Sequence, residues 1–71
     1  MIITIVTTEN RVESYDSILS HYYDPETNSI DIDTGITIIR VDDVKHFTLF
    51  SNTGTEILNA QNLDKGLMRW H

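Results

Sequence analysis

The clearest pattern along the chain is an alternation of apolar and polar residues near its middle. Ile30 and Ile32 alternate with Ser29, Asp31 and Asp33. Successive side chains of a β-strand point to opposite faces of the sheet. A period of two therefore predicts a strand over residues 29–33, with one buried isoleucine face and one acidic face in water.

The residues after this strand are typical of hairpins. Thr34-Gly35 and Asn52-Thr53-Gly54 are turn sequences, because glycine readily adopts the positive φ that tight hairpin loops need. Asp42-Asp43-Val44 is expected to form a further short turn. The segments that these turns separate are rich in Ile, Val and Phe and are expected to be strands, namely Ile36–Val41, His46–Ser51 and Thr55–Leu58.

The first third of the chain contains one clear strand and one ambiguous stretch. Met1–Thr7 has β-branched residues in both phases of the alternation, which predicts a strand covered on both faces. Glu9-Asn10 predicts a tight turn into Arg11–Tyr15. Apolar side chains in residues 12–23 fall at helical spacing, but Tyr, Val and Ile prefer strands and serine is an indifferent helix former. We favour strands broken near Asp16 and keep a helix as the alternative.

The tail from Asn59 onward changes character. Leu63, Leu67 and Trp70 lie at i, i+4 and i+7, which places them on one side of a helix, and Asn62 is a candidate N-cap. Together these patterns predict a mainly β fold for a single domain over residues 1–71. The expected form is a small antiparallel meander or an SH3-like or Sm-like barrel with a short C-terminal helix.

Charge narrows the range of partners. Eleven Asp and Glu residues oppose five Lys and Arg residues, which gives a formal net charge of −6 at pH 7. Because phosphate backbones are bound through basic surfaces, this balance argues against direct nucleic-acid binding, and anionic membranes are disfavoured for the same reason. We expect a protein partner, and a basic one would be attracted most strongly.

Chain length and residue usage set further expectations. A chain of 71 residues forms at most one domain with a modest core, so a homo-oligomer is one expected source of added stability. The absence of cysteine excludes disulfides and thiolate catalysis and fits a reducing compartment. Met1–Val6 is shorter than a signal-peptide core, and no stretch approaches the roughly 20 apolar residues of a membrane span. We therefore expect a cytoplasmic protein.

One motif suggests catalysis. Asp33-Thr34-Gly35, with isoleucine on both sides, resembles the catalytic triplet of aspartic proteases, in which two such carboxylates share a proton across a two-fold axis. That family also has a later apolar-apolar-Gly segment, whereas Ile57-Leu58 is followed by Asn59. We favour an ordinary hairpin turn, since Asp, Thr and Gly all suit turns, and expect no enzyme. A dimeric acid site at Asp33 remains the alternative.

The sequence does not match the residue spacings of common calcium and zinc sites. An EF-hand loop starting at Asp24 would need glycine at position 6 and glutamate at position 12, where this chain has Ser29 and Gly35. The three histidines match no zinc spacing. We expect no metal and no cofactor.

Two segments, Ile5–Ser14 and Val41–Phe50, resemble strand-turn pieces of small uncharacterised proteins encoded by phages and prophages of Gram-positive bacteria. This resemblance implies an accessory binder of a host or viral protein. Our leading hypothesis is therefore a non-enzymatic interaction module; the alternatives are an acidic nucleic-acid mimic that inhibits a basic protein and a structural homo-oligomer. The candidate binding residues form an acidic set, Asp24, Glu26, Asp31, Asp33, Asp42 and Asp43, and an aromatic set, Tyr22, Tyr23 and Trp70.

Overall fold

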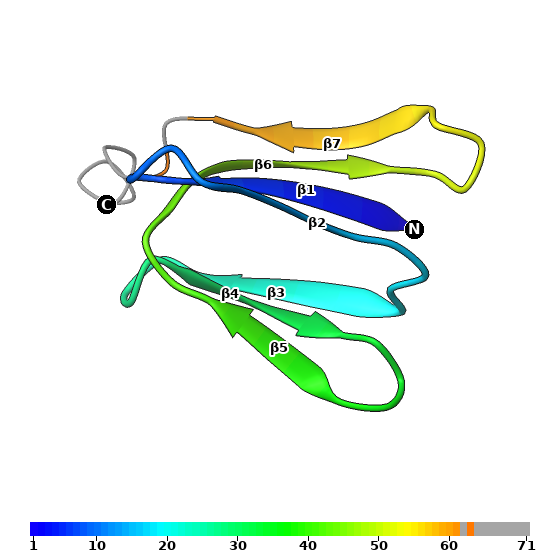
Figure 1. Ribbon diagram of the computed structural model, residues 1–71, viewed down its shortest axis with the longest axis horizontal. Helices are drawn as coiled ribbons and strands as arrows, with labels where there is room; N and C mark the ends of the chain where they lie inside the picture. The colour runs from blue at the N-terminus through cyan, green and yellow to red at the C-terminus, as the bar shows by residue number, and fades with distance from the viewer. Residues whose placement is uncertain (62, 64–71) are drawn as a thin grey trace.

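The computed structural model describes residues 1–61 and residue 63, and these residues form a two-layered β structure (Figure 1). One sheet has the strand order β2-β1-β6-β7 and the other the order β3-β4-β5, with every paired neighbour antiparallel. The strands are β1 Ile2–Thr7, β2 Val12–Tyr15, β3 Ser20–Asp24, β4 Ser29–Asp33, β5 Ile38–Val41, β6 Val44–Phe50 and β7 Glu56–Ala60. The predicted mainly β antiparallel fold is confirmed, and β3-β4-β5 is a meander.

The two central strands supply much of the core. In β4, Ile30 and Ile32 are fully buried, as the alternation predicts. In β1, Ile3 and Ile5 are fully buried, while the residues that alternate with them, Ile2, Thr4 and Val6, are only half-buried. The first strand was expected to be covered on both faces. Its inner face is fully buried, but its outer face is only half-buried.

The two sheets meet through these inner faces. Phe47 of β6 packs against two rings of β3, with ring centroids 5.9 Å from His21 and 6.1 Å from Tyr23. Phe50 lies three residues further along β6, so its side chain points to the opposite face of the sheet. It is half-buried there. The buried apolar residues are Ile3, Ile5, Ile18, Ile30, Ile32, Val41, Val44, Phe47, Leu49 and Leu63.

The stretch over residues 12–23 is two strands, β2 and β3, separated by residues 16–19, so the break near Asp16 is confirmed and the helical alternative is wrong. Ser17 in this break adopts a positive φ of 54°. The Ile18 N–H donates to the Met1 carbonyl at 3.1 Å, and the Leu19 N–H donates to the Asp33 carbonyl at 2.8 Å. The connection is therefore tied to both sheets.

The glycine turns lie where their residues predict, whereas Val44, which was expected in a turn, is the first residue of β6. Gly35 and Gly54 have φ values of 87° and 88°, in the region where glycine has no steric cost. Asn10 and Asp43 take φ values of 64° and 57° in the turns before β2 and β6. The strand expected to start at Ile36 begins two residues later, because the loop extends to Thr37.

The predicted C-terminal helix, including Trp70, lies outside the described residues, apart from Leu63, which is buried. Within the described part of the chain, no helix is long and apolar enough to cross a membrane.

Candidate binding surface

An ion pair lies at the centre of the outer face of the β3-β4-β5 sheet. Asp31 of β4 and Arg40 of β5 are directly opposite in register, and Arg40 Nε donates to Asp31 Oδ1 at 2.9 Å. Arg40 Nη2 also lies 3.5 Å from Asp31 Oδ2, so the guanidinium engages both carboxylate oxygens. The side chains remain 55% and 34% exposed for Arg40 and Asp31, which places the pair at the surface.

Two further carboxylates act on the same guanidinium. The pKa of Arg40 is raised above its usual value by the hydrogen bond that it donates to Asp31 and by the charge of Asp31, and then by the charges of Asp42 and Asp24. Partial desolvation acts in the opposite direction. We call Asp24, Asp31 and Asp42 the acidic cluster. One arginine and three aspartates give these four side chains a formal net charge of −2.

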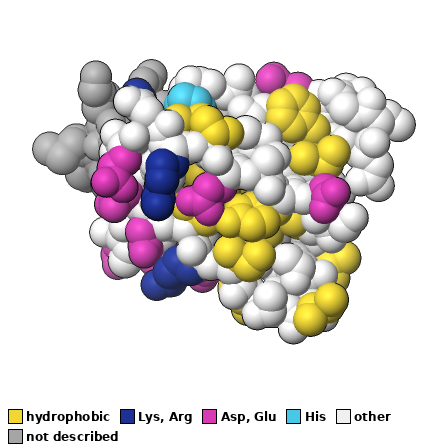
Figure 2. Space-filling model, in the orientation of Figure 1, with side chains coloured by type: hydrophobic (Ala, Val, Ile, Leu, Met, Phe, Trp, Pro, Cys, Tyr) yellow, Lys and Arg dark blue, Asp and Glu magenta, His cyan; other side chains and the backbone are white. Residues whose placement is uncertain are grey.

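The structure gathers part of the predicted acidic set and separates the rest. Glu26 and Asp43 lie in exposed turns next to members of the acidic cluster, and Asp24 Oδ1 accepts the Glu26 N–H at 2.9 Å. Asp33 lies at the opposite end of β4, beside Ile38 of β5. In Figure 2, acidic side chains border a basic one over the end of β5 that leads to β6.

The two adjacent tyrosines point to opposite sides of β3. Tyr22 is 63% exposed and lies opposite Asp31, on the same outer face as the ion pair. The Tyr23 hydroxyl donates to Asn28 Oδ1 at 2.6 Å, and its ring faces Phe47 in the core. The structure therefore separates these two members of the predicted aromatic set onto opposite faces of β3. Trp70, the third predicted aromatic, lies outside the described residues.

The Asp33-Thr34-Gly35 motif forms a closed hairpin loop. Asp33 Oδ1 accepts the Gly35 N–H at 2.8 Å, as in turns in which a carboxylate caps the backbone two residues on. Thr34 N–H and Oγ1 both donate to the Thr37 carbonyl at 3.0 Å. These hydrogen bonds close the loop that the motif forms.

Sequence reasoning missed a group of exposed apolar side chains beside this loop. Ile36 is 95% exposed, Ile38 is 66% exposed and Leu19 is 64% exposed. Leu19 lies over Gly35, where its Cδ1 would be only 2.9 Å from an added Cβ. The signal was present, since Ile36–Val41 is apolar in both phases of the alternation and must therefore turn an isoleucine outward.

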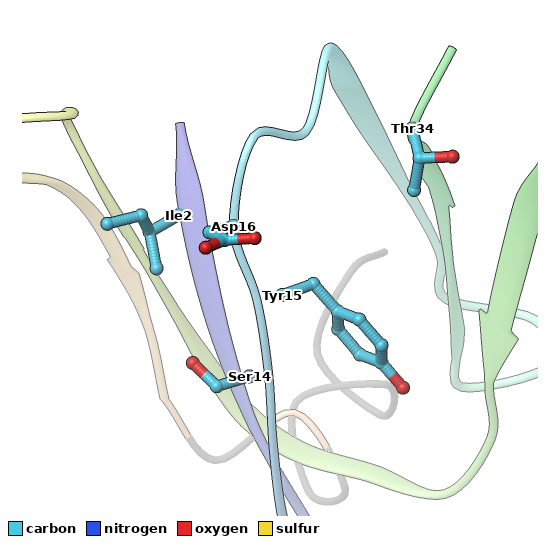
Figure 3. A pocket seen from close by; sticks show the side chains of 5 residues that line it. All are labelled: Ile2, Ser14, Tyr15, Asp16 and Thr34. Carbon is cyan, nitrogen blue, oxygen red and sulfur yellow. The ribbon is translucent and has the colours of Figure 1, made fainter. Parts of the chain in front are cut away.

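A pocket of about 470 Å³ opens between the end of β2 and the β4–β5 loop. Figure 3 shows Tyr15 extending from β2 toward the side where Thr34 lies, with Ile2 and Ser14 on the other side of the space. The residues that line the pocket are Ile2, Ser14, Tyr15, Asp16 and Thr34. These side chains give the pocket three hydroxyl groups, one carboxylate and one apolar side chain.

The Tyr15 hydroxyl at this pocket is already engaged. It donates to Glu13 Oε1 at 2.7 Å. This hydrogen bond, together with burial and the negative charge of Glu13, raises the pKa of Tyr15 above its usual value of 10.0. The phenol is therefore held in its neutral form.

Across residues 1–61 and 63, no group of three or more His, Asp or Glu side chains is placed to hold a metal ion. No protein-family model, curated protein or solved structure matches the chain. We therefore base the proposed function on the charge and exposure of the surface residues.

Proposed function

We propose that this protein is a non-enzymatic interaction module that binds a basic protein partner through the outer face of the β3-β4-β5 sheet. The observation that carries the proposal is the acidic cluster. Asp31 of this cluster pairs with Arg40, the charges of Asp24 and Asp42 also act on that guanidinium, and the exposed ring of Tyr22 lies opposite Asp31. We call this outer face the binding face.

The chemistry of the binding face suits a cationic partner. Asp31 is neutralised by Arg40, but Asp24 and Asp42 have no cation of their own in the recorded ion pairs of the described residues. A lysine or arginine of a partner could form ion pairs with those two carboxylates. The net charge of −6 adds long-range attraction that speeds encounter with a basic surface.

Tyr22 supplies the apolar component of the same face. Tyrosine is favoured at interfaces because a large rigid ring carries one polar handle and loses little conformational entropy. Tyr22 and Ile38 are both more than half exposed and both lie on the binding face. A partner that covers them would gain apolar contact next to its charge contacts.

We also propose a cellular compartment and a class of partner for this binding. We infer a cytoplasmic accessory protein of the phage type, whose partner is a basic host or viral protein. If the partner's basic surface is a nucleic-acid groove, the module would act as an inhibitor that mimics nucleic-acid charge.

The proposal is tested with a fluorescently labelled lysine-rich peptide, whose binding is followed by anisotropy at low and raised salt. The test variant is the Asp24→Asn, Asp42→Asn double variant, which leaves the Asp31–Arg40 pair intact. The control is Glu9→Gln, Glu56→Gln, which removes the same amount of charge from exposed positions elsewhere. We expect the test variant to raise the Kd roughly five- to tenfold, in line with the modest strength of exposed charge pairs.

The control should change the Kd much less than the test variant, and raised salt should weaken wild-type binding because it screens exposed charges. Equal losses in the two double variants would mean that overall charge, and not the acidic cluster, attracts the peptide. That result would contradict the proposal.

A further inference from the structure

The pocket between the end of β2 and the β4–β5 loop has the size of a small-molecule site. Its volume of about 470 Å³ falls within the range of roughly 300–1,000 Å³ that is usual for such sites. None of the five residues that line it belongs to the acidic cluster (Figure 3). The hydrogen bonds of these residues indicate which kind of ligand the pocket can accept.

The hydroxyl protons of the lining are already donated within the protein. The donations run from Tyr15 to Glu13 Oε1 at 2.7 Å, from Thr34 to the Thr37 carbonyl at 3.0 Å and from Ser14 to the Ile3 carbonyl at 3.4 Å. A hydroxyl group has one proton to donate, whereas its oxygen carries two lone pairs that accept. The three hydroxyl groups therefore offer a ligand lone pairs and no spare proton.

Asp16 is the charged residue of the lining, and its carboxylate has no partner. Within residues 1–61 and 63, no hydrogen bond or ion pair engages this carboxylate. An ionised carboxylate accepts hydrogen bonds and donates none. The backbone after Asp16 is tied down, because the Ile18 and Leu19 N–H groups donate to carbonyls at 3.1 Å and 2.8 Å. The pocket therefore presents one negative charge on a fixed connection.

This lining discriminates between classes of small molecule. An anion would meet the charge of Asp16 and would find no proton donor among the lining side chains. A polyol needs donors for its oxygens as well as acceptors for its protons, and the lining side chains supply only acceptors. An ammonium ion has three N–H donors, a positive charge and no acceptor. Its requirements are the ones that these side chains meet.

We propose that the pocket binds a small organic ammonium ion, with the cationic head at Asp16 and the alkyl part against Ile2 and the Tyr15 ring. A cation over the face of the Tyr15 ring would gain cation–π attraction in addition to its charge contact. The ring is held in place because its hydroxyl is bound to Glu13. The site depends on Asp16 and Tyr15 and not on the binding face, so it is independent of the proposed function.

The site is tested with three probes of the same chain length, namely butylammonium, butanol and butanoate. Each is titrated at millimolar concentrations and pH 7 into the isotopically labelled whole chain, and amide chemical shifts are followed. We expect butylammonium to shift the amides of residues 14–17 and residue 34. Butanol should bind at least about fivefold more weakly, because it lacks the charge, and butanoate should cause no shifts there.

A variant of Asp16 identifies the group that holds the cation. Asp16→Asn keeps the size of the side chain and removes its charge, at an exposed position where the fold does not depend on it. We expect it to raise the Kd of butylammonium at least about fivefold. The matched control is Glu9→Gln, which removes one charge from the exposed turn at the opposite end of β2 and should leave the Kd unchanged.

Four results would overturn the proposal. Equal affinities for butylammonium and butanol would mean that apolar contact alone drives binding. Equal losses in Asp16→Asn and Glu9→Gln would mean that overall charge attracts the probe. Butylammonium shifts centred on the acidic cluster would place the cation on the binding face, and an absence of shifts at high millimolar concentration would mean that the pocket takes no ammonium ion.

Discussion

The division of the β3-β4-β5 sheet into a buried and an exposed face makes a sharp prediction about stability. Ile32 of β4 is 0% exposed, whereas Ile38 of the neighbouring β5 is 66% exposed. The same substitution, isoleucine to alanine, should therefore have very different effects at the two positions. The comparison keeps the residue type and the sheet constant.

The magnitude follows from what each substitution removes. Ile32→Ala deletes three buried carbon atoms, worth about 2.4 kcal/mol at roughly 0.8 kcal/mol per buried methylene. The cavity left behind adds to this, so we expect a loss of about 3 kcal/mol. That is a large share of the roughly 4–10 kcal/mol expected for a domain of this length. Ile38→Ala should cost less than about 0.5 kcal/mol.

Urea unfolding followed by circular dichroism measures both values, at a protein concentration low enough to keep the chain monomeric. With a slope of roughly 1–1.5 kcal/mol per molar urea, Ile32→Ala should lower the midpoint by about 2 M or more, and Ile38→Ala by less than about 0.5 M. Similar midpoints for the two variants would refute the assignment of Ile32 to the inner face and Ile38 to the outer face.

Three further predictions concern one backbone angle and two side-chain hydrogen bonds. Ser17→Gly should stabilise the fold by about 0.5 kcal/mol in urea unfolding, because Ser17 holds a φ of 54° that glycine adopts without steric cost; a loss of stability would contradict this. Tyr23→Phe should cost about 1 kcal/mol in the same assay, because it leaves Asn28 Oδ1 without its hydroxyl donor. The Tyr15 phenol should titrate above its usual pKa of 10.0 in an NMR pH series, and Glu13→Gln should lower that pKa. Because the pKa of Tyr15 is raised in the folded protein, the Tyr15–Glu13 hydrogen bond contributes its full stability below pH 10, and that stability is lost as the pH rises through the folded pKa. A Tyr15 pKa at its usual value would contradict this prediction.

Much of the fold follows from short-range patterns. The alternation around Ile30 and Ile32 fixes both the strand and its buried face, because the period of two leaves only one way to bury both isoleucines. Gly35 and Gly54 mark turns because their backbone angles favour glycine. Local sequence is sufficient wherever one face of a strand is apolar and the loop residues have a conformational preference.

Pairings between distant strands could not be predicted in the same way. Nothing local to β1 indicates that its neighbours are β2 and β6, since that choice depends on which apolar faces meet in the folded chain. The same limit applies to the binding surface. Asp31 and Asp33 look equivalent in sequence, but cross-strand pairing places Arg40 beside one and Ile38 beside the other.

The most direct test of the account is an amide chemical-shift map of the isotopically labelled protein, titrated with the lysine-rich peptide. We predict that the largest shifts fall on the binding face, at Tyr22, Asp24, Asp31 and Asp42, and that they diminish when salt is raised. Shifts concentrated on the outer face of β1 and β6, or spread evenly over the molecule, would contradict the claim that the β3-β4-β5 sheet binds a basic partner.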